Sequence, residues 1–125
     1  MTDNTQNQPE VWPEEIKLSK AKDRLEIRFD DGVNVSLAAE LLRVESPSAE
    51  VQGHGVGQKT TPAGKKNILI QGIESVGNYA IRITFSDGHS TGIFSWSLLY
   101  DYATRQEALM AAYEARLAAD GGSRI

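Results

Sequence analysis

The sequence predicts an α+β fold with two small antiparallel β units, each followed by a short helix, and an amphipathic helix near the C-terminus. Two segments alternate apolar and polar side chains up to Asp31-Gly32 and Asp87-Gly88. A two-residue period is typical of a strand with one buried face, and Gly accepts the positive φ of a tight hairpin turn. The third observation is a four-residue spacing of apolar side chains near the C-terminus, which is typical of a helix.

The first β unit follows a polar N-terminal stretch. We expect residues 1–13 to form a disordered tail and residues 14–120 to form a single domain. The apolar positions of the predicted strands are Ile16, Leu18, Leu25, Ile27, Phe29, Val33, Val35 and Leu37. A short helix over residues 38–43 is expected next, with Ser36 as its N-cap.

The second β unit repeats the order of the first. Its strands and helix are expected around Ile68–Ile73, Ile81–Phe85, Thr91–Ile93 and Ser95–Tyr100. Aligning Phe29 with Phe85, at an offset of 85 − 29 = 56 residues, also aligns the two Asp-Gly turns. Leu41 and Leu98 are separated by 98 − 41 = 57 residues, so the second unit is one residue longer at this point. We interpret this as an internal pseudo-repeat. Chance similarity between two hairpins is the alternative, because only two copies are present.

The two remaining segments have different compositions. Residues 46–66 are rich in Gly and Pro and poor in apolar side chains, so we predict a mobile loop, since long loops in compact domains are usually functional or mobile. Residues 105–119 are predicted to form the C-terminal helix, opened by a capping box of Thr104 and Glu107. Its apolar stripe is Leu109, Met110, Tyr113 and Leu117. Core packing is the preferred role of this stripe, and a partner-binding groove is the alternative.

Composition limits the classes of function. Seventeen acidic and thirteen basic residues give a net charge of −4, which argues against a nucleic-acid phosphate backbone as partner. The absence of cysteine excludes disulfides and thiolate metal sites. No apolar stretch is long enough to cross a membrane, and the first residues lack the features of a secretory signal. We therefore expect a cytoplasmic protein that binds neither nucleic acid nor membranes.

A glycine-rich segment over residues 53–60 has the composition of an anion-binding loop. Backbone amides of Gly53 and Gly55 could converge on an anion, and Lys59 would add positive charge. A nucleotide-binding Walker loop is disfavoured, since Gln58 stands where glycine should precede the lysine. A flexible surface loop is therefore preferred, with binding of a small anion through Gly53–Lys59 as the alternative.

The chain has two histidines, His54 and His89, and both lie in predicted loops. With Asp87 they would supply two imidazoles and one carboxylate, a set that suits non-haem iron, although nothing in their spacing requires a metal. Asp30, Asp31 and Asp87 are explained as turn residues. The chain has no Gly-x-Ser-x-Gly sequence, so it offers no nucleophile elbow and no complete catalytic constellation.

Three stretches together carry a family resemblance: Leu42–Val51, Val76–Ile81 and Phe85–Trp96. They resemble the domain at the N-terminus of gamma-butyrobetaine hydroxylase, which also occurs alone in small bacterial proteins, and the resemblance covers residues 14–103. Family members with hydroxylase activity carry a separate domain that depends on iron and 2-oxoglutarate. A similar domain is attached to some plant iron–sulfur scaffold proteins. The resemblance therefore implies an accessory domain.

The resemblance also implies a position for a metal. The hydroxylases hold zinc in this domain through a Cys-x-Cys-x-x-Cys run and a later histidine. By position, the cysteines fall on Ser46, Ser48 and Val51, and the histidine falls on His89. Serine hydroxyls are poor ligands for zinc and valine is no ligand, so we do not expect the thiolate zinc site here. A different site for zinc or iron, formed by Glu50, His54 and His89, is a hypothesis.

From the sequence we expect a non-catalytic accessory domain that binds a protein partner and is linked to metal or iron–sulfur handling. The expected surface combines the loop 46–66 with the segment Gly88–Trp96. Its candidate residues are Arg43, Ser46, Ser48, Gly53, Gly55, Lys59, Asp87 and Trp96. The alternatives are a small-anion binder and a detached accessory module of a hydroxylase dependent on iron and 2-oxoglutarate, acting with a separate catalytic chain.

Overall fold

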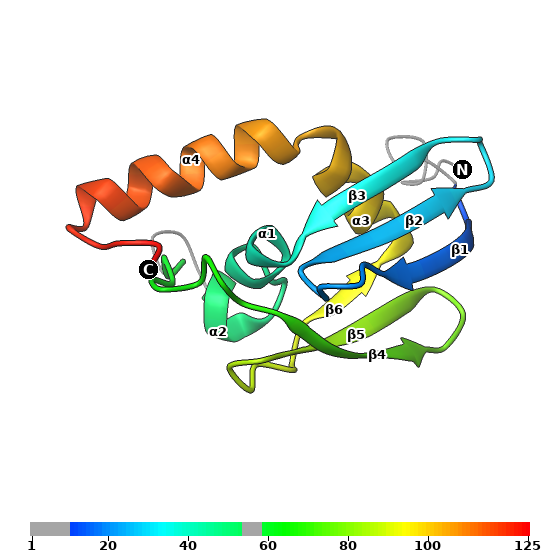
Figure 1. Ribbon diagram of the computed structural model, residues 1–125, viewed down its shortest axis with the longest axis horizontal. Helices are drawn as coiled ribbons and strands as arrows, with labels where there is room; N and C mark the ends of the chain where they lie inside the picture. Colours follow the sequence, from blue (N-terminus) through cyan, green and yellow to red (C-terminus); the bar gives the residue numbers. More distant parts are fainter. Residues whose placement is uncertain (1–10, 54–58) are drawn as a thin grey trace, which may run out of the picture.

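The computed structural model describes residues 11–53 and 59–125. Its elements are β1 (Pro13–Leu18), β2 (Arg24–Phe29), β3 (Asn34–Ala38), α1 (Ala39–Val44), α2 (Ala49–Gln52), β4 (Ile70–Val76), β5 (Ala80–Phe85), β6 (Ile93–Ser95), α3 (Trp96–Thr104) and α4 (Gln106–Ala119). Strands β1, β2 and β3 form one antiparallel sheet, and β4, β5 and β6 form a second (Figure 1). The predicted α+β class and its two β units are confirmed.

Strand pairing supports the internal pseudo-repeat. Leu25 pairs with Leu37 in the first sheet, and Ile81 pairs with Phe94 in the second. Ile81 is the counterpart of Leu25 at a sequence offset of 81 − 25 = 56, and Phe94 is the counterpart of Leu37 at an offset of 94 − 37 = 57. The first strand of each sheet is also interrupted at corresponding places, after Pro13 in β1 and after Ile70 in β4. Chance similarity of two hairpins would not reproduce both registers and both irregularities, because a one-residue slip turns every side chain to the other face.

The two units differ after the Asp-Gly turn. The backbone amide of Phe29 donates to the carbonyl of Val33, and that of Phe85 donates to the carbonyl of His89, so the offset there is still 89 − 33 = 56. Further along, Ile93 pairs with Arg82 in the second sheet, and Ser36 pairs with Glu26 in the first. The sequence offset between Ser36 and its counterpart Ile93 is therefore 93 − 36 = 57. The second unit therefore contains one additional residue between His89 and Ile93.

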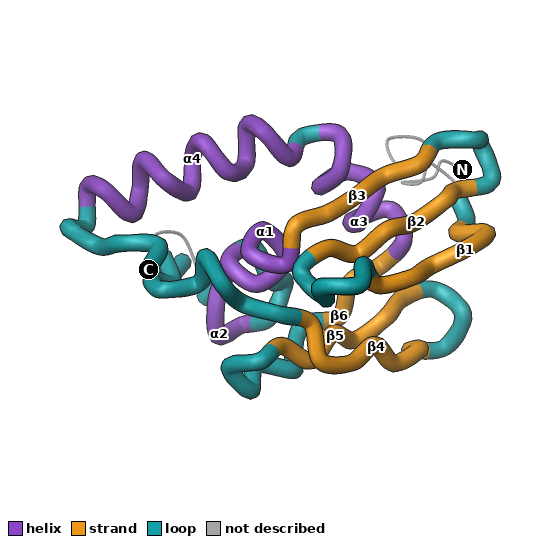
Figure 2. Tube along the Cα trace, viewed as in Figure 1, coloured by secondary structure: helices purple, strands orange, loops and turns teal. Residues whose placement is uncertain are grey.

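Both sheets contribute to one hydrophobic core. The inward residues of β2 and β3 and those of β4, β5 and β6 are buried together with apolar residues of α1 and α3. The fully buried members include Leu25, Phe29, Leu37, Leu41, Leu42, Ile70, Ile83, Phe85, Phe94 and Leu99. In Figure 2 the strands lie together, with α1 and α2 at one end of the sheets. The predicted alternation thus places the expected faces in the core.

A smaller cluster fixes α4 to the rest of the domain. Tyr113 and Leu117 of α4 are buried against Val44 of α1. The Tyr113 hydroxyl donates to the Pro62 carbonyl over 2.6 Å. Core packing therefore accounts for these two positions of the predicted stripe.

The residues after α4 also pack on the domain. The carbonyl of Ser123 accepts a hydrogen bond from the Gly64 amide, and that of Arg124 accepts one from the Lys66 amide. The Arg124 guanidinium donates to both carboxylate oxygens of the nearly buried Glu40, at 2.9 and 2.7 Å. Packed structure therefore continues past residue 120.

The predicted N-cap at Ser36 is wrong. The residue lies within β3, and the N-cap of α1 is Ala38, whose side chain offers no cap. The Gln106 side chain accepts from the Ala38 amide at 2.9 Å and donates to the Ser36 carbonyl at 3.0 Å. The side-chain amide of Gln106 thus forms hydrogen bonds with the backbone of β3, as a neighbouring strand would. The strand therefore continues up to the first residue of α1.

The predicted capping box of Thr104 and Glu107 is also wrong. Thr104 ends α3, its hydroxyl donates to the Asp101 carbonyl, and the N-cap of α4 is Arg105 without a side-chain cap. The two helices follow each other with one residue between them, so Thr104 lies in the last turn of α3 and not at the N-cap position of α4. The helix start expected at Ser95 is confirmed, since its hydroxyl accepts from the Leu98 amide at 3.2 Å.

Equivalent glycines provide a test of the pseudo-repeat. Gly32 and Gly88 have φ values of 88° and 92°, and a Cβ at either would meet no atom within 4 Å. Replacing either with alanine should therefore cost the same backbone strain, about 1–2 kcal/mol of unfolding free energy. Gly72→Ala is the matched control, because Gly72 has open space and no positive φ. Urea unfolding measures all three, and clearly unequal losses at Gly32 and Gly88 would contradict the equivalence.

Candidate functional site

The candidate residues meet where the segment between α1 and α2 contacts the turn between β5 and β6. Ser46 and Ser48 lie in the first segment, and Glu50 lies in the first turn of α2. Asp87 and His89 come from the β5–β6 turn. Ser46, Ser48 and His89 are buried although they are polar. Buried polar groups require hydrogen-bond partners, so the contacts of these side chains are informative.

The His89 ring uses both of its nitrogens. Its Nε2 lies 3.0 Å from Ser46 Oγ and 3.3 Å from Ser48 Oγ. Its Nδ1 lies 3.0 Å from Glu50 Oε1. The two serine hydroxyls are themselves 3.3 Å apart. We refer to Ser46, Ser48, His89 and Glu50 as the histidine cluster.

The contacts of His89 determine which nitrogen carries the proton. A carboxylate only accepts hydrogen bonds, so Nδ1 donates to Glu50 and Nε2 of the neutral ring accepts from a serine. Burial is the largest influence on the pKa of His89, which it lowers from the ordinary value of 6.5, and the nearby Arg43 lowers it further. Glu50 and Asp87 act in the opposite direction without reversing the shift. The neutral ring is therefore the stable form near pH 7.

Asp87 anchors the same turn through its carboxylate. Oδ2 accepts from Arg43 Nε at 2.7 Å and from Lys65 Nζ at 2.6 Å, while Oδ1 accepts from the backbone amide of His89 at 3.0 Å. Burial favours the neutral carboxyl, but hydrogen bonds from Lys65, the His89 amide and Arg43 outweigh it. The pKa of Asp87 therefore lies well below its usual range. These contacts connect α1, the segment before β4 and the β5–β6 turn.

Glu45, beside the cluster, is a buried carboxylate with two cationic partners. It lies 2.7 Å from Lys59 Nζ and 3.0 Å from Arg116 Nη2 of α4. Its backbone carbonyl accepts from the Tyr102 hydroxyl at 2.7 Å. Lys59, which we expected on an anion-binding surface, is thus already engaged with a carboxylate.

Gly92 covers the cluster. A Cβ at this position would overlap with Ser46 Oγ and would lie 3.2 Å from the Phe94 ring. Only a residue without a side chain allows the backbone to approach the serine this closely. Gly92 belongs to the segment that contains the additional residue of the second unit. That segment closes over Ser46, whereas Val33, the first unit's counterpart of His89, is exposed.

The other predicted residues lie elsewhere or outside the described part. Gly53 ends α2, with φ of 76°. Trp96 begins α3, is partly buried against the main core, and donates from Nε1 to the Asn78 carbonyl at 3.0 Å. His54 and Gly55 fall outside the residues that the structure describes.

Three residues of the site lie within the expected segments 46–66 and Gly88–Trp96 but are not singled out by the sequence. Lys65 pairs with Asp87, Thr91 donates to Glu50 Oε1 at 3.1 Å, and Gly92 covers Ser46. The one-residue difference between the repeat units pointed to the segment that holds Thr91 and Gly92. Nothing local in the sequence pointed to Lys65, because its partner is 22 residues away.

Comparison with known proteins identifies the family. The model of the family "Gamma-butyrobetaine hydroxylase-like, N-terminal" matches residues 16–100. The chain belongs to this family. No curated protein matches the chain.

Solved structures agree with this assignment. One solution NMR structure is 46% identical, with a TM-score of 0.78, and the match covers 90% of this chain and 89% of that one. A second is 45% identical, with a TM-score of 0.80, covering 99% and 90% of the two chains. A crystal structure of a protein of unknown function from the DUF971 family of Acidithiobacillus ferrooxidans is 36% identical, with a TM-score of 0.56, covering 70% and 86%.

In this gamma-butyrobetaine hydroxylase-like N-terminal domain, the residues at the expected zinc position do not fit zinc. Ser46, Ser48 and His89 lie together as the resemblance implies, and Val51 is also buried. The four side chains nevertheless offer only two hydroxyls and one imidazole as ligands, because the fourth is aliphatic. Zinc prefers thiolate, imidazole and carboxylate ligands. Among residues 11–53 and 59–125, no group of three or more His, Asp or Glu side chains is arranged to hold a metal ion.

The histidine cluster has the order of groups found in a serine hydrolase, with hydroxyl, imidazole and carboxylate in series. The solvent exposure of the serine distinguishes this cluster from a hydrolase active site, because a nucleophile must be able to reach its substrate. Ser46 is fully buried and lies under Gly92, and Ser48 is nearly buried. The geometry therefore supports a structural role for these hydroxyls.

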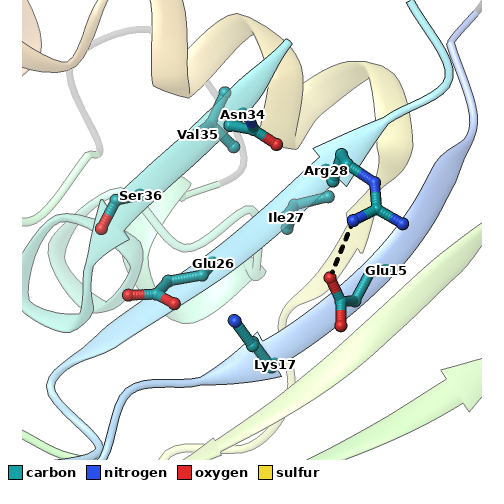
Figure 3. A pocket seen from close by; sticks show the side chains of 8 residues that line it. All are labelled: Glu15, Lys17, Glu26, Ile27, Arg28, Asn34, Val35 and Ser36. Carbon is teal, nitrogen blue, oxygen red and sulfur yellow. Dashed lines mark hydrogen bonds and ion pairs between the residues drawn. The ribbon is translucent and has the colours of Figure 1, made fainter. Parts of the chain in front are cut away.

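A separate hollow lies on the outer face of the first sheet (Figure 3). Its charged lining residues are Glu15, Lys17, Glu26 and Arg28. Arg28 is already paired with Glu14 and Glu15, at 3.3 and 3.2 Å. None of the predicted site residues lines this hollow. Separately, no helix in the described part of the chain is long and apolar enough to cross a membrane.

The close approach of Gly92 to Ser46 can be tested by substitution. Gly92→Ala should lower the free energy of unfolding by about 2 kcal/mol, because the new methyl group overlaps with Ser46 Oγ. Ser46→Ala removes that oxygen, so the double variant should lose less stability than the sum of the single losses. Urea unfolding of the wild type, the two single variants and the double variant gives the coupling free energy between the two positions. Additive losses of unfolding free energy would show that the new methyl group does not clash with Ser46.

The lowered pKa of His89 predicts a pH dependence of stability. Below the unfolded value of 6.5 the unfolded chain binds a proton more readily than the folded chain. The stability contribution of neutral His89 is therefore complete above that value and is lost as pH falls toward the folded pKa. Urea unfolding between about pH 5 and pH 8 should show a steeper loss on acidification for the wild type than for His89→Gln. Equal slopes would contradict the assignment, because all other ionisable groups are shared.

Proposed function

We propose that this domain is a non-catalytic accessory domain that binds a protein partner in the cytoplasm. The surface is an apolar corner formed by Tyr79, Ile93 and Trp96, where the β4–β5 turn meets β6 and the start of α3. Ile93 and Trp96 belong to the segment predicted from the sequence to bind a partner, and Tyr79 extends it.

The exposure of this corner is the observation that supports the proposal. Tyr79 is 54% exposed and Ile93 is 40% exposed. Aromatic side chains are enriched in protein interfaces because they bury a large area and keep a polar end for hydrogen bonding. An exposed tyrosine and an exposed isoleucine at adjoining segments of one sheet are therefore suited to a protein surface more than to a small ion.

The backbone holds the corner in place before any partner binds. Ala80 pairs with Ser95 in the ladder between β5 and β6. The Trp96 amide donates to the Tyr79 carbonyl at 3.3 Å, and the Trp96 ring nitrogen donates to the Asn78 carbonyl at 3.0 Å. A rigid surface loses little conformational entropy on association, which favours binding.

The family resemblance supports the proposed class of partner. Domains of this kind accompany iron-dependent hydroxylases and iron–sulfur scaffold proteins, so the proposed partner acts in iron or iron–sulfur handling. A separate hydroxylase chain that depends on iron and 2-oxoglutarate is the alternative partner at the same corner. The small-anion alternative has less support, because Lys59 is paired with the buried Glu45.

A binding experiment tests this corner directly. Immobilised wild-type domain should retain a partner from a lysate of the source organism, and Tyr79→Ser/Ile93→Ser should retain at least tenfold less, as measured by quantitative mass spectrometry. Val33→Ser is the matched control, because Val33 is an exposed apolar residue at the other hairpin turn. Retention by the control and not by the double variant supports the corner. Equal retention by all three proteins would contradict it, and the identity of the retained protein distinguishes the two partner classes.

A further inference from the structure

The histidine cluster joins two segments that are distant in the sequence. Ser46 and His89 are separated by 43 positions, and Ser48 and His89 by 41. The first segment links α1 to α2, and the second is the β5–β6 turn. Both serines are buried. A direct contact at this place therefore fixes how the second sheet sits against the short helices.

The distances in the cluster are those of direct hydrogen bonds between side chains. In a tetrahedral site with Zn–S near 2.3 Å and Zn–N near 2.0 Å, neighbouring ligand atoms are roughly 3.6 Å apart, whereas oxygen ligands near 2.0 Å would bring them to roughly 3.3 Å. The chemistry of the donors, and not their spacing, is therefore what argues against zinc. Here the two hydroxyl oxygens are 3.3 Å apart, and they lie 3.0 and 3.3 Å from His89 Nε2. The side chains thus approach one another directly, at hydrogen-bond distance.

The hydrogen bonds within the cluster form a continuous chain. Ser46 donates to Ser48, Ser48 donates to Nε2 of neutral His89, and Nδ1 donates to Glu50. Thr91 donates to the same Glu50 oxygen at 3.1 Å. Each polar atom of the buried part is satisfied by another protein atom. A buried network of this kind is stable without an ion, because no group is left without a partner.

We propose that the histidine cluster is a metal-free cross-link that has taken the place of zinc in this chain. A chain of hydrogen bonds from Ser46 through Ser48 to His89 holds the β5–β6 turn against the α1–α2 segment. This role is independent of the proposed partner surface. Two properties follow: chelators do not unfold the domain, and thiol oxidation cannot disturb the cross-link, because the chain contains no cysteine. Conversely, replacing the donor atoms should suffice to create a zinc site on the existing backbone.

The wild-type protein provides the first test. Purified without a histidine tag, it should contain no stoichiometric zinc by elemental analysis. Its midpoint of thermal unfolding should be unchanged by EDTA and by added zinc. One equivalent of tightly held zinc whose removal lowers the midpoint would overturn the proposal.

A variant with restored ligands provides the second test. Ser46→Cys/Ser48→Cys/Val51→Cys should bind one equivalent of cobalt with a thiolate-to-cobalt charge-transfer band, and zinc should displace the cobalt and raise the midpoint of thermal unfolding. Adding His89→Ala should weaken cobalt binding at least tenfold. Ser95→Cys/Ser97→Cys is the matched control, because these hydroxyls have the same sequence spacing and are also 3.3 Å apart, at the start of α3. Cobalt binding by the triple variant that is no tighter than binding by this control would overturn the geometric part of the proposal.

A third measurement does not depend on the folding of a cysteine variant. Ser46→Ala, His89→Ala and the double variant are compared by thermal unfolding. If the two side chains stabilise the fold through one another, the double variant should lower the midpoint by less than the sum of the single changes. Additive shifts would overturn the claim that the hydrogen bond is the cross-link.

Discussion

The burial of His89 constrains the whole second half of the domain. An imidazole that leaves water must keep its hydrogen bonds. Here Nε2 accepts from Ser48, to which Ser46 donates, and Nδ1 donates to Glu50 on the other side of the contact. The α1–α2 segment is therefore held at a set distance from the β5–β6 turn. The ion pairs of Asp87 with Arg43 and Lys65 hold the same turn from its outer side. Removing either set would leave buried or half-buried polar groups without partners.

The pseudo-repeat explains why only the second unit makes a contact like that of His89 with the α1–α2 segment. Both units have the same hairpin register and the same backbone hydrogen bonds around the Asp-Gly turn. Only the second contains the additional residue before β6, and the segment that contains it closes over Ser46 through Gly92. In the first unit the return strand pairs immediately, and Val33 remains on the surface. The two units thus differ by one residue at the place where only the second unit closes over Ser46.

Most interactions local in sequence were predictable, apart from the capping box of Thr104 and Glu107, and those that depend on distant residues were not. The alternation of Leu25, Ile27 and Phe29 follows from burial of one strand face, and each Asp-Gly turn has a local steric cause. Ser36 has the chemistry of a helix cap, but Gln106, 70 positions away, extends the strand past it. The cluster itself could be located only through the family resemblance, because spacing alone does not bring Ser46 to His89.

A metal-free cross-link also bears on how such a domain serves a partner. Zinc held by thiolates makes a fold depend on the local supply of metal and on reduced sulfur. Hydrogen bonds between Ser46, Ser48 and His89 have no such requirement, so this contact is equally stable whether metal is scarce or abundant. The apolar corner of Tyr79, Ile93 and Trp96 adjoins β5 and β6, the two strands whose connecting turn the cluster fixes. The proposed partner surface would then keep one conformation while the supply of metal changes.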